Sequence, residues 1–106
     1  MNNINDKQYY ILLIDFYDKL LTNKQLTILK YYYEEDYSLS EIATINNTSK
    51  SSIYDIINRS KILLNKYEDK LKLVYKYQQR QILYNKILTI NNKKINSLIY
   101  KCIDIE

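Results

Sequence analysis

Two helix starts follow each other closely in the segment Tyr37–Arg59, and this spacing constrains the fold more than any other feature. Ser38 and Glu41 form a capping-box pattern, in which each residue's side chain accepts a hydrogen bond from the other's backbone. Thr48 or Ser49 can cap the next helix, whose apolar positions have helical spacing: Ile53, Ile56 and Ile57. Helices joined by so short a turn cross steeply. The segment therefore predicts a helix-turn-helix, whose second helix can enter a DNA major groove.

Apolar residues recur at helical spacing along the rest of the chain, and no strand-like alternation is present. One stripe predicts a first helix near residues 6–20, with these inward positions: Tyr10, Leu13, Ile14, Tyr17, Leu20 and Leu21. The capping-box pair Thr22 and Gln25 then begins a helix that runs to about Glu34. The inward positions of that second helix are Leu26, Leu29, Tyr32 and Tyr33.

The apolar stripe that starts at Ile53 continues far beyond the helix-turn-helix. It predicts one long helix, or two nearly collinear helices with a joint around Asn65. A turn at Asn91–Asn92 precedes a last helix near 94–103. We expect an all-α fold in a single domain of residues 1–106, with a helix-turn-helix core at 6–64 and a basic helical extension at 65–106.

Glycine and proline are both absent from the 106 residues. Tight hairpins and glycine-lined phosphate loops are therefore not expected, because both need positive φ or a close backbone approach. Asparagine tolerates the left-handed conformation best among the remaining residues. We expect it to supply these turns, at Asn23, Asn46–Asn47 and Asn91–Asn92.

The residues that carry most enzyme chemistry are missing. The chain has no histidine and one cysteine, Cys102, so it offers no zinc constellation, no Ser–His or Cys–His pair and no internal disulfide. We therefore expect no catalytic residue, no metal site, no cofactor and no enzyme. The single cysteine fits a reducing, cytoplasmic setting. The first residues lack a signal-peptide pattern, and no apolar run approaches the roughly 20 residues that span a bilayer.

Charge is unevenly distributed along the chain, whose net charge is +4. Residues 1–37 carry four Lys and six acidic residues, residues 38–60 carry two basic and two acidic residues, and residues 61–106 carry ten basic and four acidic residues. The C-terminal part could attract phosphate chains, or it could be a solvated helix face written in AT-rich codons. Four basic residues form a candidate secondary surface there: Lys70, Lys72, Lys76 and Arg80.

In a helix-turn-helix the groove-facing residues lie at the start and along one side of the second helix. The candidates form what we call the recognition face: Ser49, Lys50, Ser51, Tyr54, Asn58 and Arg59. Lys50 suits a phosphate or a guanine edge, the serines suit phosphates, and Asn58 suits a base edge. Asp55 lies among them and repels phosphates unless it meets a cytosine amino group. The alternative is that the motif is retained only as a packing unit.

The order of these segments resembles region 4 of bacterial sigma factors, and the chain as a whole resembles the YlxM family of small bacterial proteins. The resemblance covers about residues 6–90 and is carried by these pieces: Phe16–Tyr17, Leu21–Gln25, Glu35–Ala43, Ser52–Asp55, Tyr67–Leu71, and Arg80 before ILYNKIL. The resemblance implies an all-helical, non-enzymatic protein of the signal recognition particle pathway, whose core is a GTPase and a small RNA. The chain departs from the usual helix-turn-helix pattern around the turn, where Asn46 and Thr48 replace apolar residues and Asn47 replaces glycine.

Two functions follow as hypotheses. The first is a nucleic-acid-binding regulator that uses the recognition face on duplex DNA or on the signal recognition particle RNA. The second is an accessory protein that binds the particle's RNA or its GTPase through the long helix, with the helix-turn-helix as a scaffold. The long apolar stripe exceeds what one small core needs, so a homodimer is expected in either case.

Overall fold

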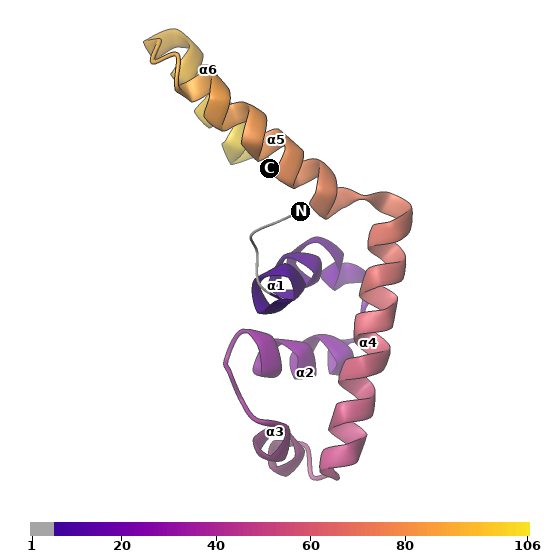
Figure 1. The fold of residues 1–106 in the computed structure, drawn as a ribbon. Helices are drawn as coiled ribbons and strands as arrows, with labels where there is room; N and C mark the ends of the chain where they lie inside the picture. The colour runs from indigo at the N-terminus through magenta and orange to yellow at the C-terminus, as the bar shows by residue number, and fades with distance from the viewer. Residues whose placement is uncertain (1–5) are drawn as a thin grey trace. The chain divides into compact units, whose positions relative to one another are not determined.

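The computed structural model describes residues 6–106 (Figure 1), and these residues form six α-helices and one 3₁₀ turn, without strands. In chain order the elements are α1 Asp6–Tyr17, η1 Asp18–Leu20, α2 Asn23–Tyr33, α3 Leu39–Ile45, α4 Lys50–Leu71, α5 Leu73–Leu88 and α6 Lys93–Ile105. The all-α prediction is confirmed.

The chain divides into two compact units, unit 1 at Met1–Lys72 and unit 2 at Leu73–Glu106. Unit 1 carries ten basic and ten acidic residues, whereas unit 2 carries six basic and two acidic residues. The whole net charge of +4 therefore belongs to unit 2. The organisation into one domain, with a core at 6–64 and an extension at 65–106, stays a prediction.

Unit 1 is organised around α4, which packs against each of α1, α2 and α3 (Figure 1). Its core consists of thirteen buried apolar side chains: Tyr10, Leu13, Ile14, Tyr17, Leu21, Ile28, Leu29, Tyr33, Ile42, Ala43, Ile53, Ile57 and Leu64. The buried residues of α4 follow one another at three- and four-residue intervals, because this spacing keeps them on one face of the helix. That face supplies the surface on which the three shorter helices assemble.

Polar contacts hold the second half of α4 to the first helices. The hydroxyl of Tyr17 donates to a carboxylate oxygen of Glu68 at 2.6 Å, and both residues are buried. One turn earlier, the side-chain amide of Asn65 donates to the hydroxyl of Tyr10 at 2.8 Å. A carboxylate buried in this way needs a donor, because an unpartnered charge inside a protein is costly. These long-range pairs fix how α1 lies on α4.

Both predicted capping boxes are present. The Thr22 hydroxyl accepts from the backbone of Gln25, and the Gln25 side chain accepts from the backbone of Thr22, at 3.1 and 3.0 Å. Ser38 and Glu41 form the same reciprocal pair at the start of α3, at 3.0 and 2.9 Å. Each box satisfies two backbone N–H groups that the helix leaves free. The local pattern therefore fixes where α2 and α3 begin.

Two inward positions of the predicted stripes are wrong. Leu20 is 51% exposed because the chain tightens into a 3₁₀ turn after Tyr17, which changes the direction of the following side chains. Tyr32 is 37% exposed and lies edge-on to the Tyr33 ring, while Ile28 is fully buried in α2.

The backbone turns depart from expectation at two places. Four of the residues in 6–106 have positive φ: Asp36, Asn47, Lys72 and Asn91. Asn47 and Asn91 fit the asparagine prediction, but Asn23 is the first residue of α2 and the prediction for it is wrong. The expected joint around Asn65 is also wrong, since Asn65 lies inside α4. The break comes at Lys72, whose φ is 57° and whose N–H donates to the Glu68 carbonyl.

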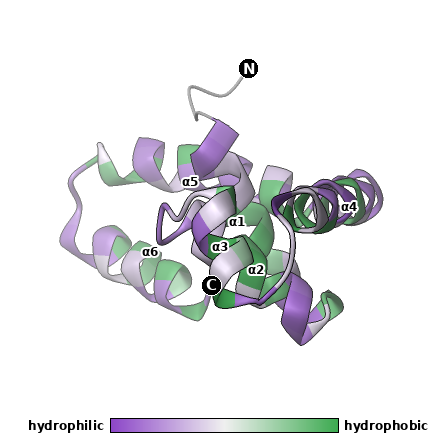
Figure 2. Cartoon of the chain, turned by 90° about the horizontal axis from the view of Figure 1, so that it is seen from below, coloured by the Kyte–Doolittle hydropathy of each residue, from purple (hydrophilic) through white to green (hydrophobic). Residues whose placement is uncertain are grey.

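Unit 2 consists of α5 and α6, which pack against each other (Figure 2). The turn between them ends at Asn92, whose side chain accepts from the backbone N–H groups of Lys94 and Ile95 and caps α6. Both helices carry hydrophobic residues, yet just two of the unit's apolar side chains are buried, Val74 and Ile99. Unit 2 thus has a small core for its length.

Candidate nucleic-acid interface

Backbone hydrogen bonds within the turn between α3 and α4 hold its conformation. Asn47 has a φ of 56°, and its N–H donates to the Thr44 carbonyl at 3.3 Å. The N–H of Thr48 donates to the Ala43 carbonyl at 3.0 Å, which completes a Schellman motif. The Asn46 side chain adds a third bond, to the Ile42 carbonyl at 2.9 Å. These bonds satisfy the end of α3 without glycine, so the turn is well defined despite its unusual sequence.

Ser49, rather than Thr48, caps α4. Its hydroxyl accepts from the backbone N–H of Ser52 at 3.1 Å, and it lies 3.2 Å from the hydroxyl of Ser51. The Ser49 oxygen is therefore committed to the helix start. Ser51 is exposed and keeps a hydroxyl beside the first turn, where the helix dipole favours a phosphate.

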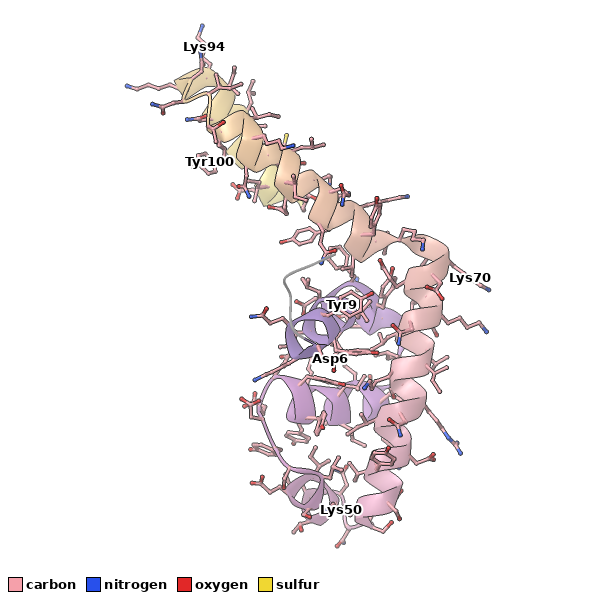
Figure 3. All side chains as sticks on the ribbon, in the orientation of Figure 1. Asp6, Tyr9, Lys50, Lys70, Lys94 and Tyr100 are labelled. Atoms are coloured by element: carbon pink, nitrogen blue, oxygen red, sulfur yellow. The ribbon has the colours of Figure 1, made fainter. Side chains whose placement is uncertain are left out.

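The other members of the recognition face lie on the first half of α4 and are mostly open to solvent. Lys50 is exposed in the first turn (Figure 3), Tyr54 is 57% exposed, and Asn58 is half-buried one turn later. Lys50, Tyr54 and Asn58 succeed one another at intervals of four residues, so they form one row along the helix. The structure therefore brings the sequence-predicted residues together on one accessible surface.

The electrostatic contribution of Arg59 is reduced by a neighbour. Its Nε lies 3.1 Å from Oδ2 of Asp55, one turn earlier, and both side chains are more than half exposed. An exposed pair at this spacing contributes only about 0.3–0.5 kcal/mol. It can open when a phosphate replaces the carboxylate. Lys50, the other cation of the recognition face, has no ion pair among the described residues.

The candidate secondary basic surface is divided between the two units. Lys70 and Lys72 lie at the end of α4 in unit 1, and Lys76 and Arg80 lie on α5 in unit 2. Lys50 and Lys70 mark opposite ends of α4 (Figure 3). Arg80 donates to the carboxylate of Glu106 on α6, so its charge is partly balanced.

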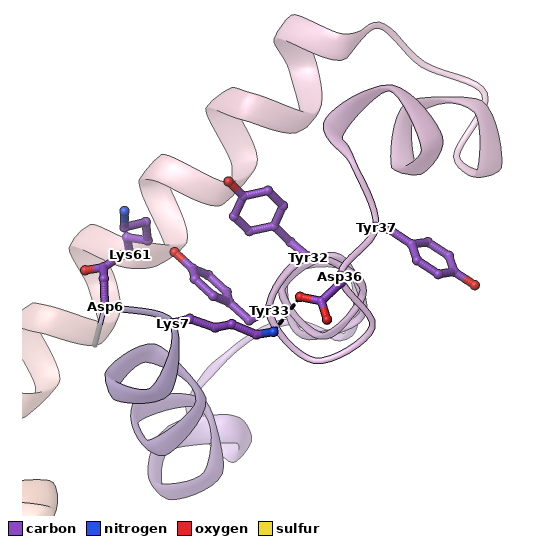
Figure 4. A pocket seen from close by; sticks show the side chains of 7 residues that line it. All are labelled: Asp6, Lys7, Tyr32, Tyr33, Asp36, Tyr37 and Lys61. Carbon is purple, nitrogen blue, oxygen red and sulfur yellow. Dashed lines mark hydrogen bonds and ion pairs between the residues drawn. The ribbon is translucent and has the colours of Figure 1, made fainter. Parts of the chain in front are cut away.

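A pocket of about 450 Å³ in unit 1 was not predicted from the sequence (Figure 4). Seven residues of α1, α2, α4 and the segment after α2 line it: Asp6, Lys7, Tyr32, Tyr33, Asp36, Tyr37 and Lys61. Its two acids and two lysines balance, and Lys7 pairs with Asp36 at 2.5 Å. Burial, and then the nearby carboxylate of Asp6, raise the pKa of Tyr33 above its ordinary value. The pocket therefore presents no excess positive charge to a phosphate, and no local motif could have revealed it.

Residues 6–106 contain no group of three or more Cys, Asp or Glu side chains arranged to hold a metal ion. No helix in that range is both long and apolar enough to cross a membrane.

Comparison with known proteins identifies the family. Residues 4–102 match the UPF0122 family, described as "Putative helix-turn-helix protein, YlxM / p13 like". The chain is 45% identical to a UPF0122 protein of Malacoplasma penetrans over 95 residues, which are 90% of this chain and 83% of that protein. It is 47% identical to a UPF0122 protein of Listeria innocua over 83 residues, or 78% of this chain and 76% of the relative. Neither the family description nor these names indicate an enzyme. The chain belongs to the UPF0122 family of YlxM/p13-like helix-turn-helix proteins.

Proposed function

We propose that the protein is a non-enzymatic regulator that binds nucleic acid through the first half of α4 and takes part in the signal recognition particle pathway. The observation that carries the proposal is the row of exposed Lys50, exposed Tyr54 and half-buried Asn58 on the second helix of a helix-turn-helix. A helix in that position can enter a major groove with its N-terminal residues toward the bases. The assignment to the targeting pathway rests on the resemblance to the YlxM family.

The recognition face carries two cations, Lys50 and Arg59, and this number determines the expected affinity and salt dependence of binding. Each phosphate that a cation neutralises releases counterion, and the logarithm of the affinity then falls by about 0.9 per phosphate for each unit of log salt. Lys50 and an Arg59 released from Asp55 provide two such contacts. We expect modest affinity for random duplexes, with specificity supplied by Asn58 and Tyr54 at base edges.

Fluorescence anisotropy tests this proposal. Random duplex DNA and the signal recognition particle RNA of the same cell are titrated with the protein at two salt concentrations. Lys50→Ala with Arg59→Ala should weaken binding and flatten the salt dependence. Lys24→Ala removes an exposed lysine of α2 that lies outside the recognition face, and it should leave both unchanged. Unchanged affinity in the double variant would exclude the recognition face.

The uneven charge favours a second candidate. Residues 61–106 carry ten basic and four acidic residues, so the second candidate is an accessory protein that binds the particle's RNA or its GTPase through the candidate secondary basic surface, with the helix-turn-helix as a scaffold. Neutralising Lys70, Lys72, Lys76 and Arg80 should then abolish binding, while recognition-face variants should bind normally. Full binding after neutralisation of those four residues would reject this candidate.

A homodimer remains a proposal. In unit 1 the apolar face of α4 is covered by α1, α2 and α3, so that stretch of the stripe does not require a second copy. Light scattering over a range of concentrations distinguishes a monomer from a dimer.

A further inference from the structure

Unit 2 leaves much of its apolar surface uncovered. Two apolar side chains of this 34-residue unit are buried, whereas Ile82, Leu83, Leu98 and Ile105 are between 49% and 85% exposed. Monomeric proteins seldom expose contiguous apolar patches without a reason. The question is whether these side chains are scattered or gather on one face.

Three exposed residues of α6 and the half-buried Ile95 form a regular row, and the exposed Tyr100 lies outside it. Ile95, Leu98, Cys102 and Ile105 follow at intervals of three, four and three residues, which is the spacing of a coiled-coil seam. Leu98, Cys102 and Ile105 are exposed, and Ile95 is half-buried. The seam therefore lies at the edge of the α5–α6 contact, where another helix could continue the packing.

A matching row runs along α5. Lys76, Arg80, Leu83 and Ile87 follow at intervals of four, three and four residues, so they share one side of that helix. Arg80 donates to Glu106, which follows directly after Ile105. This contact places the middle of the α5 row beside the C-terminal end of the α6 row. We call the apolar residues of the two rows the apolar strip: Leu83, Ile87, Leu98, Cys102 and Ile105.

Lysines lie at one end of this strip and along its α6 side. Lys76 continues the α5 row, and Lys94 and Lys101 lie one position before Ile95 and Cys102, on the solvent side of α6. Lys94 is labelled in Figure 3 and, with Leu98, lines a hollow of about 410 Å³. An apolar centre with a basic border complements a helix that has an apolar stripe between acidic residues.

We propose that the apolar strip of unit 2 docks an acidic amphipathic helix of another protein, which would lie along α5 and α6 as a third helix. Charge is the argument against a second copy, because each unit 2 carries a net +4 and its borders would place lysine against lysine. A nucleic acid would meet the lysines but would leave the aliphatic side chains without a partner. The proposal does not depend on nucleic-acid binding by α4.

The test uses the full chain and a designed, fluorescently labelled helical peptide with Leu at its seam positions and Glu on both flanks. A matched peptide carries Lys in place of Glu. We expect the acidic peptide to bind and the basic peptide to fail. Leu98→Gln with Ile105→Gln should weaken binding at least about tenfold, because seam residues dominate such interfaces. Lys94→Gln with Lys101→Gln should weaken it and remove its salt dependence.

Two controls separate a docking defect from misfolding. Leu20→Gln replaces an exposed leucine of unit 1 and should not change binding. A peptide with one cysteine at its central seam position should form a disulfide with Cys102 under mild oxidation, detected by mass spectrometry, because Cys102 lies in the strip and is the one cysteine of the chain.

Four results would overturn the proposal. The first is no binding of the acidic peptide, and the second is equal binding of both peptides. The third is a dimer in light scattering that Leu98→Gln with Ile105→Gln converts to monomer, since a second copy would then occupy the strip. The fourth is binding to vesicles of phosphatidylcholine and phosphatidylserine that the same variant abolishes, since a lipid surface would then be the partner.

Discussion

Units 1 and 2 are both helical, but they bury their apolar side chains to very different degrees. Thirteen apolar side chains are buried in the described part of unit 1, residues 6–72, against two in the 34 residues of unit 2. Unit 1 surrounds one long helix with three others, whereas a pair of helices has no third element to cover the outer side of its contact. The difference shows that a segment can form helices without burying most of its apolar side chains. Unit 2 consists of two helices, but its core is small.

The largest expected effect on stability is the difference between truncating a buried leucine in unit 1 and an exposed leucine in unit 2. Leu64 is fully buried in unit 1 and Leu98 is 61% exposed in unit 2. Leu64→Ala should lower the free energy of unfolding by about 2–5 kcal/mol, because it removes buried contacts and leaves a cavity. Leu98→Ala should change it by no more than about 0.5 kcal/mol. Urea denaturation of both variants measures the contrast, and similar losses would refute the difference in packing.

A smaller change should strengthen unit 2. The Nε2 atom of Gln78 and the Oδ1 atom of Asn96 are buried without a hydrogen-bond partner among the described residues. A buried donor without a partner costs about 1–3 kcal/mol. Gln78→Met keeps the length of the side chain and removes that donor, so it should raise stability by about that amount. Gln79→Met, at an exposed neighbouring site, is the control. A destabilised Gln78→Met variant would show that the amide has a partner in solution.

Removal of the N-cap of α4 in unit 1 should lower the free energy of unfolding by about 1 kcal/mol. Ser49→Ala removes the oxygen that accepts from Ser52, and such losses cost about 1 kcal/mol. Ser51→Ala, two residues on, removes a hydroxyl that is not the cap and should cost less. Thermal unfolding monitored by circular dichroism compares them, and equal costs would contradict the assignment of Ser49 as N-cap.

The smallest expected effect is pH-dependent. Hydrogen bonds from the backbone and then the side chain of Ser38 lower the pKa of Glu41 from its ordinary 4.5. A lowered pKa in the folded state means that the stabilisation is present above pH 4.5 and is lost as the pH falls through the lower value. Ser38→Ala removes the side-chain contribution and keeps the larger backbone one, so it should move the pKa of Glu41 part of the way back toward 4.5, as measured by NMR titration of the carboxyl group. Ser40→Ala should not move it, and an unchanged titration in Ser38→Ala would mean that the capping box does not form in solution.

Local patterns in the sequence were sufficient to predict where α2, α3, α4 and α6 begin. Thr22, Ser38 and Asn92 all act within three residues of their own position, so their partners can be found by counting along the chain. The helix-turn-helix follows from the same rules, because both of its helix ends are closed by neighbouring residues.

Features that depend on distant residues could not be predicted in this way. The contact of Tyr17 with Glu68 joins residues 51 positions apart, and the pocket at Tyr33 draws its lining from several elements. The pairing of Arg59 with Asp55 could have been predicted, because opposite charges four residues apart on a helix commonly form ion pairs. The break at Lys72 had no sequence signal, because lysine is an ordinary helix former and rarely takes positive φ.

The absence of glycine reduces the conformational freedom of the unfolded chain, and the four described residues of positive φ add strain to the folded one. A chain without glycine has fewer conformations to lose when it folds, and this favours the native state. Asp36, Asn47, Lys72 and Asn91 offset part of that gain, because a side chain in the left-handed region is strained. A residue of opposite chirality favours positive φ and adds no backbone freedom. A chemically synthesised chain with D-amino acids at these four positions should therefore keep the restricted unfolded state while relieving the strain of the folded one.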